Sequence, residues 1–251
     1  MLRLAVAATR QADRLSLRTG RRSVARMGRL RVGGPMEVVV EAGQVQLPGT
    51  VRTPPAPRGC VVFAHGSGSS RHSPRNVWVA QALHARGFAT LLFDLLTAEE
   101  SDLDADSRTL RFDVPLLAGR LTSAVDTVRQ IPTTRSLSIG LFGASTGAAA
   151  ALTVAARRPE EVDAVVSRGG RPDLAGAALG AVQAPTLLLV GGLDRAVLQL
   201  NHAAADRMTA PHEVAVVTGA SHLFEEPGTL EEVARLAGDW FEIHLAAAPE
   251  D

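Results

Sequence analysis

The sequence predicts an α/β fold in which a mainly parallel, doubly wound sheet carries helices on both faces. Short apolar runs typical of buried strands alternate with longer segments of helical spacing along most of the chain. This alternation favours parallel strands joined by crossover helices. A serine flanked by glycines, directly after one apolar run and before an alanine-rich segment, indicates a sharp strand-to-helix turn.

Each element has its own local signal. Two strand patterns flank Ala42-Gly43, which indicates a hairpin turn, and a proline-rich stretch leads into the third strand. Gly87 ends a helix with one apolar face, and Ala184-Pro185 precedes another buried run. The polar stretch 97–111 is the longest predicted loop. The expected strands are 36–41, 44–50, 59–64, 88–93, 138–142, 163–167, 186–190 and 212–217, and the expected helices are 76–86, 115–130, a helix after the glycine-flanked serine, 196–208 and 229–245.

The segment Gly143-Ala144-Ser145-Thr146-Gly147 predicts a nucleophile elbow. A serine at such a turn is held in a strained backbone conformation that exposes its hydroxyl at the edge of the sheet. Side chains two residues before and after the serine would collide with the turn, so glycine is needed at both places and is found at both. Ser145 is therefore the candidate nucleophile.

Two further residues that follow strands are candidates for the acid and the base that a serine nucleophile requires. A serine hydroxyl needs a base, and the base needs an acid that fixes its tautomer. Asp194 follows the strand 186–190 and His222 follows the strand 212–217, so both are expected at the carboxyl edge of the sheet with Ser145. Taken singly, Asp194 could be an ordinary helix N-cap and His222 a loop histidine. The coincidence of three placements favours nucleophile, acid and base.

A loop of small residues after the third predicted strand is the fourth part of the predicted active site. The segment His65-Gly66-Ser67-Gly68 lets the backbone approach a ligand closely. A backbone N–H of such a loop and the N–H after the nucleophile bind a developing oxyanion, so the expected donors are Ser67 and Thr146. A phosphate-binding loop is the alternative, but the segment lacks a Gly-Lys-Ser/Thr ending and the chain contains no lysine.

These motifs resemble those of the α/β-hydrolases, and of their dienelactone-hydrolase-like group, over residues 36–247. The resemblance is carried by the loop at 65–68, the elbow at 143–147, Gly191-Gly-Leu-Asp194 and Gly219-Ala-Ser-His222. It implies the α/β-hydrolase fold. Many members insert a lid between the sixth and seventh strands, but residues 168–185 are too few for a separate cap domain. Dienelactone hydrolases proper use a cysteine nucleophile, whereas this chain has a serine at the elbow and its single cysteine, Cys60, at a strand start where a core position is expected. The resemblance therefore favours an ester-type hydrolase rather than the dienelactone substrate itself.

Two arginine clusters flank the predicted site. Arg168 and Arg171 lie at the carboxyl end of the sixth strand, and Arg71 and Arg75 follow the small-residue loop. A guanidinium group binds carboxylate or phosphate through its planar fork, so these side chains predict a preference for anionic substrates. Arg168 is the first candidate because it immediately follows the strand. Each arginine could equally pair with a neighbouring acidic side chain.

Composition limits the remaining possibilities. A length of 251 residues with 46% hydrophobic and 21% charged residues fits one α/β domain. A single cysteine excludes an intramolecular disulfide and fits a reducing, cytoplasmic compartment. No apolar run approaches a membrane span, no histidine spacing indicates a metal site, and no cofactor is expected.

The net charge of zero hides an arginine-rich amino-terminal segment. Residues 1–35 contain nine arginines and one acid, Asp13, which leaves the remainder with a net charge of −8. A transit peptide and an arm for nucleic acid or anionic lipid are alternatives. Met36 stands directly before the first strand pattern, and no aromatic residues interleave the arginines. We therefore expect a leader at 1–35, disordered or upstream of the natural start, a single domain at 36–251, and no nucleic-acid or membrane partner.

The expected function is hydrolysis of carboxylic esters, lactones or thioesters of modest size. Ser145 would attack to form an acyl-enzyme, His222 would carry the proton, Asp194 would orient His222, and water would release the acyl group. Acyl transfer or amide cleavage by the same triad, and a non-catalytic α/β-hydrolase scaffold that binds a ligand, are the alternatives. No motif specifies the acyl group, the leaving group or the oligomeric state.

Overall fold

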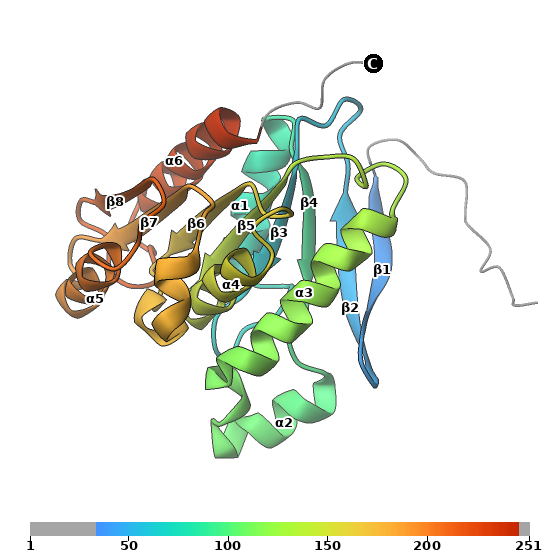
Figure 1. Ribbon diagram of the computed structural model, residues 1–251, viewed down its shortest axis with the longest axis horizontal. Coiled ribbons are helices and arrows are strands. Elements are labelled where there is room, and N and C mark those ends of the chain that lie inside the picture. Colours follow the sequence, from blue (N-terminus) through green and yellow to red (C-terminus); the bar gives the residue numbers. More distant parts are fainter. Residues whose placement is uncertain (1–33, 246–251) are drawn as a thin grey trace, which may run out of the picture. The chain divides into compact units, whose positions relative to one another are not determined.

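Residues 34–245 are described by a computed structural model and form one eight-stranded sheet with helices on both faces (Figure 1). The strands are β1 (Pro35–Ala42), β2 (Val45–Arg52), β3 (Cys60–Ala64), β4 (Ala89–Phe93), β5 (Ile139–Ala144), β6 (Ala164–Arg168), β7 (Thr186–Gly191) and β8 (His212–Val217). Their order across the sheet is β1-β2-β4-β3-β5-β6-β7-β8. Neighbours from β4 to β8 are parallel, whereas β2 is antiparallel to both β1 and β4. The sheet is therefore mainly parallel, as the sequence predicts.

The hairpin of β1 and β2 forms at the predicted turn. Ala42 pairs with Val45, so only Gly43 and Gln44 lie between the strands. Gly43 has a φ of 66°, which glycine adopts without a steric penalty. β2 then pairs with β4 and joins the hairpin to the parallel part of the sheet.

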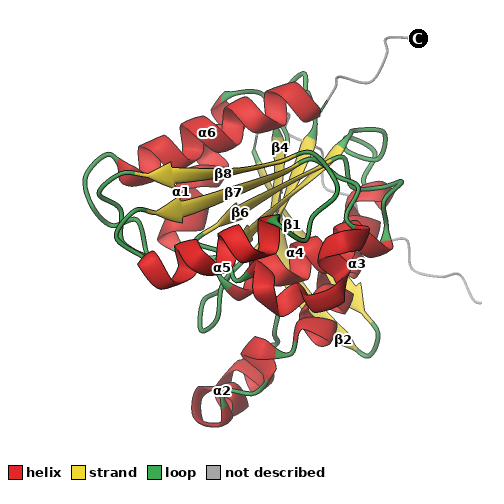
Figure 2. Ribbon diagram, turned by 60° about the vertical axis from the view of Figure 1, so that its left-hand side comes forward, coloured by secondary structure: helices red, strands yellow, loops and turns green. Residues whose placement is uncertain are grey.

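Helices cover both faces of the sheet (Figure 2). They are α1 (Pro74–Ala85), α2 (Ala98–Ser107), α3 (Val114–Gln130), α4 (Thr146–Arg157), α5 (Arg195–Ala205) and α6 (Thr229–His244), with the 3₁₀ helices η1 (Leu110–Phe112) and η2 (Pro172–Ala181). α1 and α6 pack on one face around a cluster that includes Leu83 and Phe241, and α3, α4 and α5 pack on the other with Leu121. Successive side chains of a strand point to opposite faces, so Val61 lies in the first cluster and Val62 in the second. The fold is therefore doubly wound.

The segment 97–111 is not the loop that its polarity predicts, because it contains α2 and η1. α2 begins with a capping box, in which the Thr97 hydroxyl accepts from the Glu100 N–H and the Glu100 carboxylate accepts from the Thr97 N–H. The helix lies away from the sheet, at the bottom of Figure 2, and most of its residues are exposed. An exposed helix needs no apolar face, so its sequence lacks the periodicity by which helices are predicted.

The segment between β6 and β7 is short, as expected, and holds only η2 and its flanking turns. Residues 1–33 of the predicted leader lie outside the described residues. Of its last two residues, Gly34 precedes β1 and Pro35 begins it. Within residues 34–245, no helix combines the length and the apolarity needed to cross a membrane.

Candidate active site

Ser145 occupies the turn between β5 and α4. Its φ of 50° and ψ of −120° are strained for any residue other than glycine. A Cβ atom on Gly143 would lie 2.7 Å from the Ala148 amide nitrogen, and one on Gly147 would lie 2.6 Å from the His65 carbonyl oxygen. Both distances are too short for a real Cβ, so the turn requires both glycines. The backbone of the predicted elbow is therefore present.

The loop after β6 holds the elbow from one side. The Ser145 N–H donates to the Arg168 carbonyl at 3.2 Å, and the Arg171 N–H donates to the Ser145 carbonyl at 3.0 Å. Gly169, between these two arginines, lies against His222: a Cβ on Gly169 would be 3.7 Å from His222 Cε1. The same loop therefore contacts both the serine and the histidine, which share one edge of the sheet.

His222 and Asp194 are hydrogen-bonded. His222 Nδ1 lies 2.6 Å from Asp194 Oδ2, and their side chains are 40% and 15% exposed. A carboxylate can only accept, so Nδ1 carries the proton and Nε2 is the acceptor of the neutral ring. The other oxygen of Asp194 accepts from the Val197 N–H at 3.4 Å and caps α5. The N-cap role that the sequence left as an alternative therefore coexists with the contact to His222.

Asp94, a second acid at the same edge, is engaged elsewhere. Its carboxylate accepts from the Arg71 N–H at 2.7 Å and forms an ion pair with the Arg71 guanidinium. Among the described carboxylates it is therefore Asp194, and not Asp94, that contacts His222.

The loop after β3 lies against the serine from the opposite side. A Cβ on Gly66 would be 3.1 Å from Ser145 Cβ. The hydroxyls of Ser67 and Thr146 are 2.8 Å apart and hydrogen-bonded, which ties this loop to the first turn of α4. The N–H groups of that first turn have no partner within the helix. The two residues predicted to bind an oxyanion are thus brought together beside Ser145.

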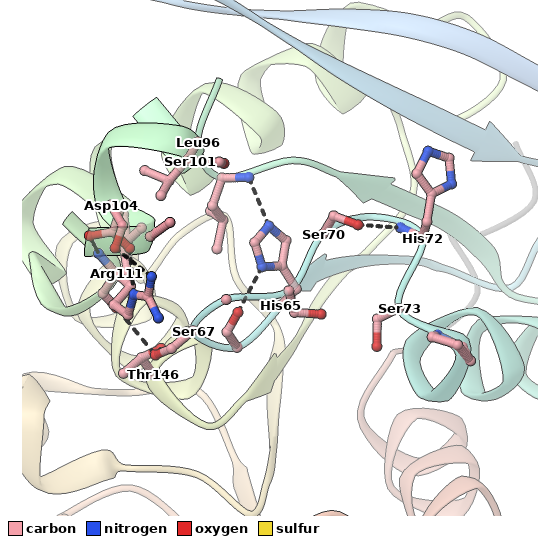
Figure 3. A pocket seen from close by; sticks show the side chains of 17 residues that line it. His65, Ser67, Ser70, His72, Ser73, Leu96, Ser101, Asp104, Arg111 and Thr146 are labelled. Carbon is pink, nitrogen blue, oxygen red and sulfur yellow. Dashed lines mark hydrogen bonds and ion pairs between the residues drawn. The ribbon is translucent and has the colours of Figure 1, made fainter. Parts of the chain in front are cut away.

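His65 anchors this loop, a role that the sequence did not suggest. Its Nε2 accepts from the Leu95 N–H at 3.0 Å, which leaves the proton on Nδ1, and Nδ1 donates to the Gly66 carbonyl at 3.0 Å (Figure 3). Burial lowers the pKa of His65 from its ordinary value of 6.5. The ring is therefore held neutral, in one tautomer, between β4 and the loop.

Two other supporting residues also escaped prediction. Glu226 accepts from the Ser221 N–H at 3.0 Å, and this hydrogen bond, the first of several, lowers the pKa of the Glu226 carboxyl. Asn201, fully buried on α5, donates to the Gly170 carbonyl at 3.0 Å. Both fix loops that border the serine and the histidine. The Asn201 contact is tertiary and the Glu226 contact lies within one irregular loop, so no regular spacing in the sequence signals either.

A cavity of about 670 Å³ opens between the loop after β3 and α2 (Figure 3). Ser67 and Thr146 line it on the sheet side, and Asp104 and Arg111 line it on the α2 side. Asp104 is 2% exposed, and it accepts from the Leu110 N–H and pairs with Arg111. The segment predicted as a loop therefore forms a wall of the cavity, and the signal for its helix was the Thr97-x-x-Glu100 capping pattern.

Three of the four predicted arginines are paired with acids. Arg71 pairs with Asp94, Arg75 with Glu225 at 3.1 Å, and Arg171 with Asp173 through two hydrogen bonds of 2.8 and 2.7 Å. The sequence left the pairings with Asp94 and Asp173 open, whereas it gave no sign that Glu225 would pair with Arg75.

Arg168 differs from the other three. It is 8% exposed, it contacts no carboxylate among residues 34–245, and its Nη1 is buried without a hydrogen-bond partner. Burial, and the nearby Arg75 guanidinium, lower the pKa of Arg168 to about 10, so it remains charged at neutral pH.

Known proteins are similar to this chain in sequence and in fold. The dienelactone hydrolase family matches residues 47–243. The crystal structure of a dienelactone hydrolase from Anabaena variabilis is 52% identical, with a TM-score of 0.83 over 85% of this chain and 99% of that one. A dienelactone hydrolase-like promiscuous phosphotriesterase from metagenomic libraries, 19% identical, has a TM-score of 0.71 over 86% of this chain and all of its own, and shares the fold.

Two longer relatives come from Mycobacterium tuberculosis strains CDC 1551 and H37Rv. Each carries the name "Putative phosphoribosyl transferase" and is 58% identical over 209 residues. The match covers 83% of this chain but 46% of the relatives, so the chain spans about half their length. The family match over residues 47–243, together with the 52% identical hydrolase structure, shows that this chain belongs to the dienelactone hydrolase family and has its α/β-hydrolase fold.

Proposed function

We propose that the protein is a serine hydrolase that cleaves carboxylic esters, lactones or thioesters through an acyl-enzyme. The observation that carries this proposal is the 2.6 Å hydrogen bond between His222 and Asp194. His222 also contacts the loop after β6, which holds the strained Ser145. A serine in an ordinary turn would need neither the strain nor a histidine of fixed tautomer in contact with the same loop.

The chemistry follows from these positions. Ser145 Oγ attacks the substrate carbonyl while His222 Nε2 takes its proton, and the N–H groups of Ser67 and Thr146 bind the oxyanion. The intermediate collapses when His222 returns the proton to the leaving alcohol or thiol, and for a lactone this group stays attached to the acyl chain. Water then attacks the acyl-enzyme with His222 again as base, which releases the acid and restores Ser145.

Acyl transfer is the alternative that uses the same residues, because an alcohol or amine can replace water in the second step. Amide cleavage differs only in the leaving group. Product analysis with a competing alcohol or amine distinguishes hydrolysis from transfer. We infer that the name of the mycobacterial relatives refers to the part of those proteins outside the match, because the matched 209 residues cover only 46% of their length.

A fluorophosphonate probe and a panel of p-nitrophenyl esters, lactones and acyl thioesters test the proposal. The wild-type protein should be labelled and should hydrolyse at least one class, and Ser145→Ala should lose both properties. Ser123→Ala, on α3, is the control and should retain both. Labelling that persists in Ser145→Ala would overturn the assignment, and absence of labelling and turnover in the wild type would favour the non-catalytic scaffold.

A further inference from the structure

The cavity beside α2 adjoins the proposed nucleophile on the side away from His222. Thr146, which lines the cavity, directly follows Ser145, and a Cβ on Gly66, another lining residue, would be 3.1 Å from Ser145 Cβ. His222 does not line the cavity. It contacts the loop after β6, which holds Ser145 from the opposite side. The cavity is therefore open to one half of a substrate that reacts at Ser145.

The chemistry of the serine decides which half enters the cavity. His222 returns a proton to the leaving alcohol or thiol, so this part of the substrate must lie beside His222. The oxyanion must point to the N–H groups of Ser67 and Thr146. At a tetrahedral carbon, the acyl chain then takes the remaining direction, which leads away from His222 and toward the cavity.

The inner face of α2 forms the outer wall of the cavity. Ser101, Asp104 and Ala105 line the cavity from positions i, i+3 and i+4, which share one face of a helix. Leu103 lies on the opposite face and is 71% exposed. Asp104 is buried, although the residues of α2 on either side of it are exposed. The helix therefore presents one defined face to whatever occupies the cavity.

The charges on this wall cancel. Among the described residues that line the cavity, Asp104 and Arg111 are the only carboxylate and guanidinium, and they form an ion pair with each other. The four arginines predicted at the site do not line the cavity. A charged group that entered would lose its hydration without finding an uncompensated partner. The lining therefore favours an uncharged group.

Hydroxyl groups make the cavity polar without charging it. Ser70 accepts from the His72 N–H at 3.2 Å, and Ser73 accepts from the Asn76 N–H at 3.5 Å. Each hydroxyl therefore keeps its own proton for another acceptor. Figure 3 shows both serines across the cavity from the α2 side. The apolar part of the lining includes Leu95, Leu96 and Leu117.

We propose that this cavity is the acyl pocket of the enzyme and takes an uncharged acyl chain that carries a hydrogen-bond acceptor, such as a keto or ether oxygen. The inference rests on the hydrolase function proposed above and names its substrate class. A volume of about 670 Å³ admits a chain well beyond acetyl. Ser101 and Ala105, on the inner face of α2, limit its length.

Bulk added to the inner face of α2 tests the position of the pocket. Ala105→Phe should lower kcat/KM for p-nitrophenyl hexanoate by at least about tenfold and change that for the acetate less than about twofold, because the ring displaces the far part of the chain. Ser101→Phe should act in the same way. Leu103→Phe, on the outer face, is the matched control and should alter neither ester. Equal effects on both esters in Ala105→Phe and Ser101→Phe would overturn the proposal.

Three p-nitrophenyl esters with acyl groups of equal heavy-atom count test the substrate class. They are the 5-oxohexanoate, the 5-methylhexanoate and the hydrogen glutarate. After correction for spontaneous hydrolysis, kcat/KM of the wild type should be highest for the oxo ester, about two- to tenfold above the methyl ester, the range for one neutral hydrogen bond, and lowest for the glutarate.

Asp104→Asn removes the charge that neutralises Arg111 and keeps an acceptor oxygen in its place. This variant should raise kcat/KM for the glutarate ester relative to the two neutral esters. A wild type that prefers the glutarate ester would contradict the assignment of an uncharged acyl chain.

A binding measurement without turnover separates the pocket from the hydrolase function. 5-Oxohexanamide, an uncharged analogue of the acyl part, should raise the Tm of Ser145→Ala. The shift should disappear when Ala105→Phe is added and persist when Leu103→Phe is added. Amide binding of this kind without turnover of any ester would refute the hydrolase proposal alone. Ester turnover that ignores Ala105→Phe, with no such shift in Tm, would refute the acyl pocket alone.

Discussion

Replacing Ser145 by glycine should leave the protein more stable than replacing it by alanine, which reverses the usual order of these two residues. Both replacements remove the hydroxyl, so the comparison isolates the backbone. At φ 50° and ψ −120° a residue with a Cβ is strained, and glycine is not.

The magnitude follows from two opposing contributions. Relief of the strain should stabilise the glycine variant by about 1–3 kcal/mol. The greater freedom of glycine in the unfolded chain should destabilise it by about 0.5–1 kcal/mol relative to alanine. The net difference is about 1 kcal/mol in favour of Ser145→Gly, or about 3 °C in Tm for a domain of this size.

Urea and thermal unfolding of both variants measure this difference directly. The matched control is Ser123 in α3, a helical position where Ser123→Gly should be less stable than Ser123→Ala by about 1 kcal/mol. If Ser145→Gly is also the less stable of its pair, residue 145 is not strained and the case for an elbow fails. Neither Ser145 variant should hydrolyse esters or react with the fluorophosphonate probe.

Three other expectations concern His65, Asp194 and the predicted leader. Burial lowers the pKa of His65 below 6.5, so the unfolded chain takes up a proton that the folded one does not, and the free energy of unfolding should fall as pH drops below 6.5. Urea unfolding between about pH 5 and 8 should show a weaker pH dependence for His65→Gln than for the wild type, and equal slopes would refute the argument. Asp194→Asn should lower kcat by up to about 10⁴-fold because the amide no longer enforces the tautomer of His222, and a nearly silent change would show that Asp194 does not orient His222. A chain that begins at Met36 should keep the Tm and the activity of the full chain, and a loss of several degrees would show that the leader packs on the domain.

Local chemistry explains why the elbow was predictable from sequence. The requirement for glycine at 143 and 147 arises from atoms of the turn itself and of the strand beside it. It therefore appears in the sequence as two glycines at a fixed distance from the serine. The apolar runs at β3 to β7 are buried on both faces, and their strands lie within two residues of the predicted ranges. The elbow depends on residues that are close in the chain, and the strands depend on burial alone, so both can be predicted from the sequence.

Tertiary contacts explain what the sequence could not supply. Nothing in the spacing of Arg71 and Arg168 distinguishes the arginine that lacks an acid from the one that has one, because Asp94 reaches Arg71 only in the folded chain. α2 was missed for a related reason, since an exposed helix stabilised by its cap shows no apolar stripe. The cavity that it borders was therefore absent from the prediction.

The burial of α4 has a consequence for how the molecule fluctuates. Ten of its 12 residues are buried, and it contacts α3, β5 and η2. Amide hydrogens in such a segment exchange with solvent only when the whole domain opens, whereas those of exposed loops exchange through small local openings. Ser145 directly precedes α4. His222, in contrast, lies in a loop that also contains the exposed residues Leu223 and Glu225. We therefore expect the two regions to differ in opening free energy, so that on warming the loop of His222 opens while the strand and helix that carry the serine remain folded.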